Sequence, residues 1–344
     1  MGTVLKDLVN DNRSLSLAGM CKNAGKTTVL NRIIRELDKT KCRMGLTSIG
    51  RDGEASDIVT GTLKPGIFVR EGTILATAAG LLPFCDTTKE ILDTSGIHTP
   101  MGEVVVVRAL SDGNVQLAGP STNTQLIQVS GIFNRYGVDK IIIDGAISRK
   151  SLCSTKVAQS VILCSGASYD KNIDRVVADT EFFSELLSLK AFKYGGLIGD
   201  NEVEGRQENF HNRYRLMDPQ GNGIPCTAAG LLENLSDKNH ENWKYCYLKG
   251  AVTDLVIKPL LMSNLKLEDK VFIAGDSSKI LLCNDVYSKM KIKGASMEVL
   301  SKTDLLAVTI NPFSAYGNHF DKDLFMEKIS EKITCPIFNV MEDE

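Results

Sequence analysis

The sequence predicts an α/β fold with a mostly parallel sheet, because short apolar runs alternate with segments of helical periodicity. Residues 15–18 form a largely apolar run, and residues 27–37 follow with apolar side chains every three or four positions. Residues 141–143 are three isoleucines in succession, which is typical of a strand buried on both faces of a parallel sheet. Strands and helices that alternate in this way pack as a sheet covered by helices.

The same alternation continues along the chain. Further strands are expected at residues 44–49, 104–110, 115–118, 161–164, 245–248, 271–274, 305–310 and 336–340. Further helices are expected at residues 125–136 and 172–187. The Asp112-Gly113 pair tolerates the positive φ of a tight turn, so the strands on either side of it are expected to form a hairpin.

The length of 344 residues allows two domains of ordinary size. We expect the first domain over residues 1–198 and a second, C-terminal α/β lobe over residues 245–344. Residues 199–244 between them are polar and contain an Asn-Gly pair, two prolines and many charges, which is typical of a linker or an excursion between lobes.

Composition and charge narrow the class of protein. Apolar residues make up 43% and charged residues 24%, which is ordinary for a globular protein, and no apolar stretch approaches the roughly 20 residues that span a bilayer. No secretory signal is evident and the nine cysteines form no C-x-x-C pair, so we expect a cytosolic protein with reduced thiols. The formal charge of −2 without a long run of either sign argues against a nucleic-acid partner. Small molecules and proteins are the expected partners.

One segment matches a phosphate-binding motif. Residues 19–27, Gly-Met-Cys-Lys-Asn-Ala-Gly-Lys-Thr, fit G-x-x-x-x-G-K-[ST] between an expected strand and an expected helix. Gly19 and Gly25 let the backbone curl around an anion, with backbone N–H groups pointing at the phosphates. Lys26 would meet the β/γ-phosphate oxygens, and the Thr27 hydroxyl would hold Mg²⁺. The fold is therefore predicted to be that of a P-loop NTPase, and an ordinary strand-turn-helix is the alternative.

A carboxylate from a neighbouring strand should complete the metal site. Asp144 follows the apolar run 141–143 and is the candidate Walker B residue, unless it is a turn residue that caps the next segment. Asp52 lies in the polar loop 51–65, which is either a switch that coordinates metal or water or a solvated loop. The predicted catalytic residues are Lys26, Asp144 and Asp52, and the predicted metal ligands are Thr27 and Asp144. The predicted nucleotide-binding residues are Gly19, Lys22, Asn23, Ala24, Gly25, Lys26, Thr27 and Thr28.

The sequence defines the nucleobase less clearly than it defines the phosphate-binding loop. The sequence contains no N-K-x-D guanine-reading motif, and its nearest match, S-K-T-D at residues 301–304, is better explained as a tight polar turn than as a guanine contact. ATP with Mg²⁺ is therefore favoured over GTP. Residues 250–254, 275–279 and 311–317 each follow an expected strand, where open α/β sheets place their ligand crevice, although helix caps and turns explain them nearly as well.

Four motifs together resemble a known family. They are residues 19–27, residues 47–54 (Thr-Ser-Ile-Gly-Arg-Asp-Gly-Glu), residues 142–146 (Ile-Ile-Asp-Gly-Ala) with Arg149-Lys150-Ser151, and residues 308–312 (Val-Thr-Ile-Asn-Pro). Over most of its length the chain resembles the smaller P-loop ATPase component of the lysine 5,6-aminomutase reactivating factor of amino-acid-fermenting bacteria. The first motif is widespread, the other three are family-like, and residues 200–245 depart from the resemblance.

The resemblance implies a chaperone-like ATPase that works with a larger, MutS-like ATPase. Together they would restore an adenosylcobalamin- and pyridoxal-phosphate-dependent aminomutase after its cobalamin is damaged. More distantly, the loop and layout are similar to dethiobiotin synthetase and to metal- or cobalamin-chaperone GTPases. The rival hypotheses are therefore an ATP-dependent enzyme that acts on a small molecule and a GTPase metallochaperone, which would need a guanine reader and a Cys/His metal site.

Overall fold

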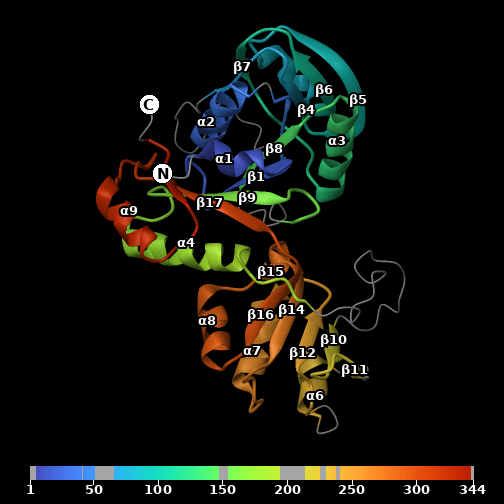
Figure 1. The fold of residues 1–344 in the computed structure, drawn as a ribbon, viewed down its shortest axis with the longest axis vertical. Helices are drawn as coiled ribbons and strands as arrows, with labels where there is room; N and C mark the ends of the chain where they lie inside the picture. Colours follow the sequence, from blue (N-terminus) through green and yellow to red (C-terminus); the bar gives the residue numbers. More distant parts are fainter. Residues whose placement is uncertain are drawn as a thin grey trace. The chain divides into compact units, whose positions relative to one another are not determined.

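The computed structural model describes residues 5–40, 42–50, 66–146, 154–193, 214–224, 230–237 and 241–341 (Figure 1). The chain divides into two compact units, of which the first combines residues 1–184 with 304–344 and the second is 185–303. Each unit has a sheet of its own with helices beside it. The α/β class expected from the alternation of strands and helices is therefore confirmed.

The first unit is built around a sheet of mostly parallel strands. Among the described residues it has nine strands in the order β18-β17-β9-β1-β8-β2-β4-β6-β5. They are β1 (Ser14–Gly19), β2 (Met44–Ser48), β4 (Ile74–Ala78), β5 (Lys89–Thr99), β6 (Gly102–Ala109), β8 (Lys140–Ala146), β9 (Ser160–Gly166), β17 (Asp304–Asn311) and β18 (Ile337–Asn339). The strands from β18 to β4 are parallel to one another, so they end at one common edge, and β6 pairs antiparallel with both β4 and β5.

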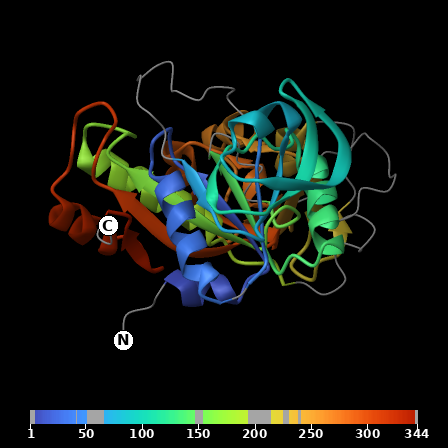
Figure 2. The same ribbon diagram turned by 90° about the horizontal axis from the view of Figure 1, so that it is seen from above.

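Helices cover both faces of this sheet (Figure 2). On β8, Ile142 joins the apolar cluster of helix α2 (Lys26–Asp38), whereas Ile141 and Ile143 join that of helix α3 (Asn123–Arg135). Successive strand residues point to opposite faces, so an all-apolar strand needs a helix on each side. The unit also contains α1 (Leu5–Asn10), α4 (Ile173–Leu187), α9 (Lys322–Ser330) and the 3-10 helix η1 (Ala79–Phe84).

The second unit has a smaller mixed sheet in the order β11-β10-β12-β14-β16. Its strands are β10 (Tyr214–Met217), β11 (Gly223–Ile224), β12 (Tyr245–Leu248), β14 (Val271–Asp276) and β16 (Ser296–Ser301). Strands β12, β14 and β16 are parallel, and β10 is antiparallel to β12. The helices are α6 (Leu231–Ser236), α7 (Asp254–Met262) and α8 (Asn284–Ile292), and a short parallel pair joins β13 (Val252–Thr253) to β15 (Ile280–Leu281).

The division of the chain differs from the expected lobes. Residues 304–344 do not belong with 245–303, because β17 pairs with β9 along its whole length and extends the first sheet. The expected linker 199–244 contains β10, β11 and α6, and Leu216 and Met217 on β10 are fully buried. The second unit is thus inserted into the first, and β10 pairs with β12 where a linker was expected.

The hairpin expected around Asp112-Gly113 is also wrong. β6 pairs with β4 and β5, whereas β7 (Gly113–Val115) pairs with β3 (Ile67–Val69). Gly113 is the first residue of β7 and does not take the positive φ expected of it, so the strands on either side of Asp112-Gly113 pair with partners elsewhere in the sequence. Strand β5, which has a mostly exposed and polar pattern, was not predicted.

The composition predicted that no segment spans a bilayer and that the cysteines are reduced. No helix in them combines the length and the apolar character needed to cross a bilayer. The cysteines described are all free thiols, at positions 21, 42, 85, 164, 246, 283 and 335.

Candidate functional site

Residues 19–27, which we call the glycine loop, connect β1 to α2 at the carboxyl edge of the first sheet (Figure 1). The backbone takes positive φ at Asn23 (61°) and at Gly25 (90°). Glycine adopts such angles freely, and asparagine is among the few other residues that tolerate them. Gly25 is the N-cap of α2, and no side chain caps the first turn of that helix. The loop therefore curls in front of a helix N-terminus whose N–H groups can meet an anion.

Lys26 folds back across the start of the loop. A Cβ atom placed on Gly19 would lie 2.8 Å from Lys26 Nζ and 2.9 Å from Lys26 Cδ, so the lysine occupies the space that a side chain at Gly19 would take. Gly19 is therefore required for this position of the ammonium group. The first helical residue thus brings its charge back to the start of the glycine loop, next to Gly19.

The charge of Lys26 affects the pKa of two thiols, the partly buried Cys21 and the fully buried Cys164. Burial raises the pKa of Cys21 to about 11, and Lys26 opposes that shift. Burial likewise raises the pKa of Cys164 on β9 to about 11, with Lys26 lowering it and Asp144 raising it. The ammonium of Lys26 and the carboxylate of Asp144 therefore both act on the fully buried thiol of Cys164, which lies on β9 opposite Gly19.

Asp144 lies on β8, the strand next to β1. In the parallel register it stands opposite Leu17 on one side and Ser48 on the other, close to the carboxyl edge where the glycine loop begins. Thr27 lies in the first turn of α2, which contacts β8. Among the described residues no cluster of three or more His, Cys, Asp or Glu side chains could hold a metal. A hydroxyl and one carboxylate nevertheless suit Mg²⁺, which in nucleotide sites takes its other ligands from phosphate and water.

Asn23 contributes a buried polar atom to the glycine loop. Its Nδ2 atom is buried and has no hydrogen-bond partner among the described residues. A buried N–H donor left without a partner costs about 1–3 kcal/mol, so such groups are rare unless a ligand or water completes them. An anion bound in the loop would supply the acceptor. In the same loop Ala24 is fully buried, and Lys22 is exposed.

The ends of β9 and β17 pack against the glycine loop. A Cβ atom on Gly25 would lie 3.3 Å from both Asn311 Cβ and Val340 Cγ2, and one on Gly166 would lie 2.6 Å from the Asn311 carbonyl oxygen. Residues 311–317 were expected to border a ligand crevice, and their first residue does lie beside the loop. The contact of Val340 was not predicted, because it depends on β18 following β17 in the sheet.

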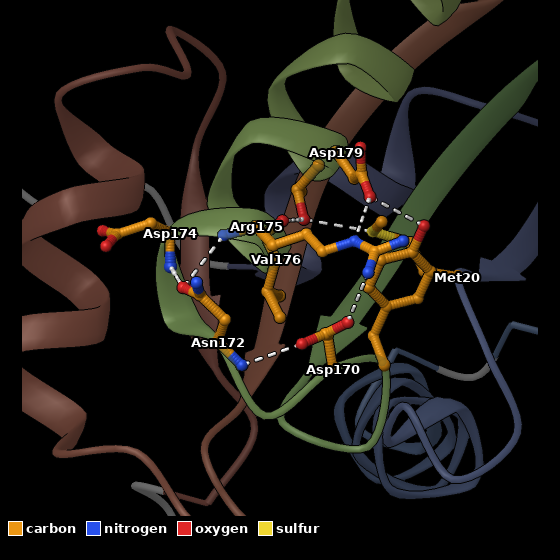
Figure 3. A network of polar contacts seen from close by, with 9 residues as sticks. Met20, Asp170, Asn172, Asp174, Arg175, Val176 and Asp179 are labelled. Atoms are coloured by element: carbon orange, nitrogen blue, oxygen red, sulfur yellow. Dashed lines mark hydrogen bonds and ion pairs between the residues drawn. The ribbon is translucent and has the colours of Figure 1, made fainter. Parts of the chain in front are cut away.

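A network of polar contacts joins the glycine loop to α4 (Figure 3). The hydroxyl of Thr180, buried on α4, lies 3.0 Å from the sulfur of Met20, 2.7 Å from Ser165 Oγ on β9 and 2.6 Å from the Val176 carbonyl oxygen. Met20 follows Gly19 directly, and its N–H donates to the Cys164 carbonyl oxygen at 2.9 Å. The entry of the loop is thus fixed to both α4 and β9.

The outer part of this network positions Tyr169, which follows β9. Its hydroxyl donates to Asp179 Oδ2 at 2.9 Å, and burial, followed by this bond, raises the pKa of Tyr169 to about 12. Arg175 makes ion pairs with Asp170 at 3.0 Å and with Asp179 at 3.9 Å. Arg175 and Asp179, which are labelled on α4 in Figure 3, thus tie the loop after β9 to the first turns of the helix. No spacing rule in the sequence indicated this network.

The predicted switch loop 51–65 and the S-K-T-D segment 301–304 do not join the glycine loop among the described residues. Asp52 and the whole of the loop 51–65 lie outside the described residues, as do Arg149, Lys150 and Ser151. The S-K-T-D segment 301–304 leads into the start of β17, where Asp304 pairs with Ser160, the first residue of β9. Because β9 and β1 are parallel, that segment lies at the edge opposite the glycine loop. The structure therefore excludes it as a guanine contact for a nucleotide bound there.

Comparison of the whole chain with protein-family models, with curated proteins and with solved structures gave no match.

Proposed function

We propose that this chain is a P-loop NTPase that binds ATP with Mg²⁺ in the glycine loop. The observation that carries the proposal is the geometry of that loop, in which Lys26 crosses Gly19 and the backbone turns through positive φ at Asn23 and Gly25 before α2. The position of Lys26 and the positive φ angles both suit the binding of an anion. A simple connection from a strand to a helix needs neither of them. The orphaned Nδ2 of Asn23 adds independent support.

In this proposal the residues of the chain act mainly by position and charge. The N–H groups of the first turn of α2 and the Lys26 ammonium hold the phosphates, since transfer of a phosphoryl group depends on electrostatic stabilisation more than on covalent chemistry. Thr27 and Asp144 would hold the metal ion, which would supply positive charge that stabilises the phosphates. Asp52 stays a predicted contributor from the loop 51–65.

The cellular role we propose is that of a chaperone-like ATPase, as the resemblance implies. Its partners would be a larger MutS-like ATPase and an adenosylcobalamin- and pyridoxal-phosphate-dependent aminomutase. A dethiobiotin synthetase-like enzyme would use the same loop with a small organic substrate. The exclusion of the S-K-T-D segment from the site weakens the case for a GTPase metallochaperone.

The binding proposal is tested by Lys26→Ala, with Lys39→Ala as its matched control at the other end of α2. We expect Lys26→Ala to abolish ATP binding in calorimetry with Mg²⁺ while circular dichroism stays unchanged, because its ammonium faces the ligand rather than a core. Lys39→Ala should bind as the wild type does. An unchanged Kd in Lys26→Ala would contradict the proposal.

The cellular role is tested by reactivation. An aminomutase inactivated by turnover is mixed with this protein, its larger ATPase partner, ATP and fresh adenosylcobalamin, and recovered activity is followed. We expect recovery with the wild type and none with Lys26→Ala. Equal recovery with both would reject the role, and ATP hydrolysis stimulated by a small amino or carboxylic acid alone would favour the dethiobiotin synthetase-like alternative.

A further inference from the structure

An ordered aromatic hairpin follows β17 next to the glycine loop. It comprises residues 311–320, in which Phe313 pairs with His319 in an antiparallel bridge and their rings lie 6.2 Å apart. Phe313 is 52% exposed and Tyr316 is 53% exposed. Large aromatic side chains usually bury most of their surface, so exposed rings on an ordered segment indicate a surface kept for contact.

Hydrogen bonds hold this hairpin in place. Within it, bonds run from Phe313 N–H to Asn311 Oδ1 (3.0 Å), from Ser314 N–H to the Asn318 carbonyl (2.9 Å) and from Phe320 N–H to the Pro312 carbonyl (2.9 Å). To the loop after β9, bonds run from Ala315 N–H to Ser168 Oγ (3.2 Å) and from Asn318 Nδ2 to the Ala167 carbonyl (2.9 Å). The rings are therefore presented by a braced segment rather than by a loose loop.

The hairpin lies on the nucleoside side of the glycine loop. In the sheet, β1 has β8 with Asp144 on one side and β9 followed by β17 on the other. A metal-holding carboxylate marks the end of the phosphate chain where the β- and γ-phosphates lie. The nucleoside must then leave the loop in the opposite direction, over the ends of β9 and β17. Asn311, the first residue of the hairpin, is in contact distance of Gly25 on that side.

We propose that the aromatic hairpin is the base-binding subsite of this protein, with the Phe313 ring stacking on a purine. The inference rests on the proposed nucleotide binding and goes beyond it, because the glycine loop accounts for the phosphates alone. Stacking suits any purine, which is consistent with a site that lacks the guanine-reading motif N-K-x-D. Tyr316, equally exposed on the same hairpin, borders this surface.

The test compares a ligand that has a base with one that has none. Binding of ATP and of inorganic tripolyphosphate, each with Mg²⁺, is measured by calorimetry on the full chain. In Phe313→Ala we expect the Kd for ATP to rise about 5- to 100-fold, as loss of one stacked base predicts, and the Kd for tripolyphosphate to stay within about twofold. Phe313→Trp should keep the affinity for ATP.

Phe84→Ala is the matched control. Phe84 is likewise an exposed phenylalanine, at 61% exposure, and it lies in η1 directly after β4. In the sheet, β4 is separated from β17 by four strands, β9, β1, β8 and β2, so Phe84 lies far from the aromatic hairpin. Phe84→Ala should change neither Kd. An unchanged Kd for ATP in Phe313→Ala, or an equal loss for both ligands, would overturn the base-binding role while leaving phosphate binding intact. Failure of the wild type to bind either ligand would reject the proposed function, and the subsite with it.

Discussion

Gly19 and Gly25 lack a side chain for different physical reasons. At Gly19 a Cβ would meet the flexible end of Lys26, which can move away at little cost in folding energy. At Gly25 the backbone has φ of 90°, which strains any L-residue by roughly 1–2 kcal/mol, and the neighbours are Asn311 and Val340. The first glycine therefore serves the lysine, and the second serves the turn.

This difference predicts opposite effects of two similar substitutions. We expect Gly19→Ala to change the free energy of unfolding by less than about 0.5 kcal/mol but to weaken ATP binding strongly, because the lysine is displaced. Gly25→Ala should lower the free energy of unfolding by about 1–2 kcal/mol as well as weaken binding. Urea unfolding and calorimetry on the two variants check this. Equal stability loss in both would contradict it.

Asp144 and Asp139 allow a second comparison, since they lie near opposite ends of β8. Asp139 accepts a hydrogen bond from Arg43 N–H at 3.0 Å just before the strand begins. We expect Asp144→Asn to leave ATP affinity within about tenfold but to reduce hydrolysis far more, because the carboxylate acts chiefly in the transition state. Asp139→Asn should hydrolyse ATP at the wild-type rate. A phosphate-release assay on both decides the point.

At the scale of elements, β9 and α4 are joined by one buried pair of hydroxyls. Ser165 and Thr180 are fully buried, and their oxygens lie 2.7 Å apart. Thr180→Val leaves the Ser165 hydroxyl without this partner and should cost about 1–3 kcal/mol. Adding Ser165→Ala to that variant should cost little more, because the orphaned group is then gone. Denaturant titration of the single and double variants measures this coupling.

The same pair bears on the site, because Thr180 also contacts Met20 at the start of the glycine loop. A shift of α4 relative to β9 would therefore move Met20 and change the position of the glycine loop. One turn nearer the start of α4, Arg175 pairs with Asp179, which accepts the hydrogen bond of Tyr169 in the loop after β9. The loop is thus held by an element far along the chain, which local sequence could not indicate.

At the scale of the whole molecule, one partly buried and one fully buried thiol make the free energy of unfolding depend on alkaline pH. Burial raises the pKa of Cys21 and of Cys164 from 9.0 to about 11. Between pH 9 and 11 the unfolded chain loses these protons first, so the free energy of unfolding falls as pH rises, by up to about 1.4 kcal/mol per pH unit for each thiol. Below pH 9 both states keep the proton, and this contribution is fully present.

We therefore expect the free energy of unfolding, measured in urea at pH 8, 9 and 10, to decline above pH 9. Cys164→Ala lowers stability by the cavity it leaves, yet it should make that decline shallower. Cys283 is exposed and is the N-cap residue of α8. The variant Cys283→Ala should leave the decline of the free energy of unfolding with pH unchanged. A slope equal in all three proteins would contradict the assignment to Cys164.

Local sequence determined most of the elements. The expected strand 245–248 coincides with β12, and the expected helix 27–37 lies within α2, because hydrophobic periodicity and glycine positions are short-range signals. The glycine loop and Asp144 were likewise predicted, since each needs only a motif or a strand end beside it. Their places in the structure, at adjacent strands of one sheet, agree with that expectation.

Tertiary structure decided what pairs with what. The return of residues 304–344 to the first sheet, the insertion of 185–303, and the separate partners of β6 and β7 all depend on contacts between distant segments. A strand shows its burial in its own residues but not the identity of its neighbour. For the same reason the contacts of Asn311 and Val340 with Gly25 became visible only once β17 and β18 lay beside β9, where burial of their apolar residues places them.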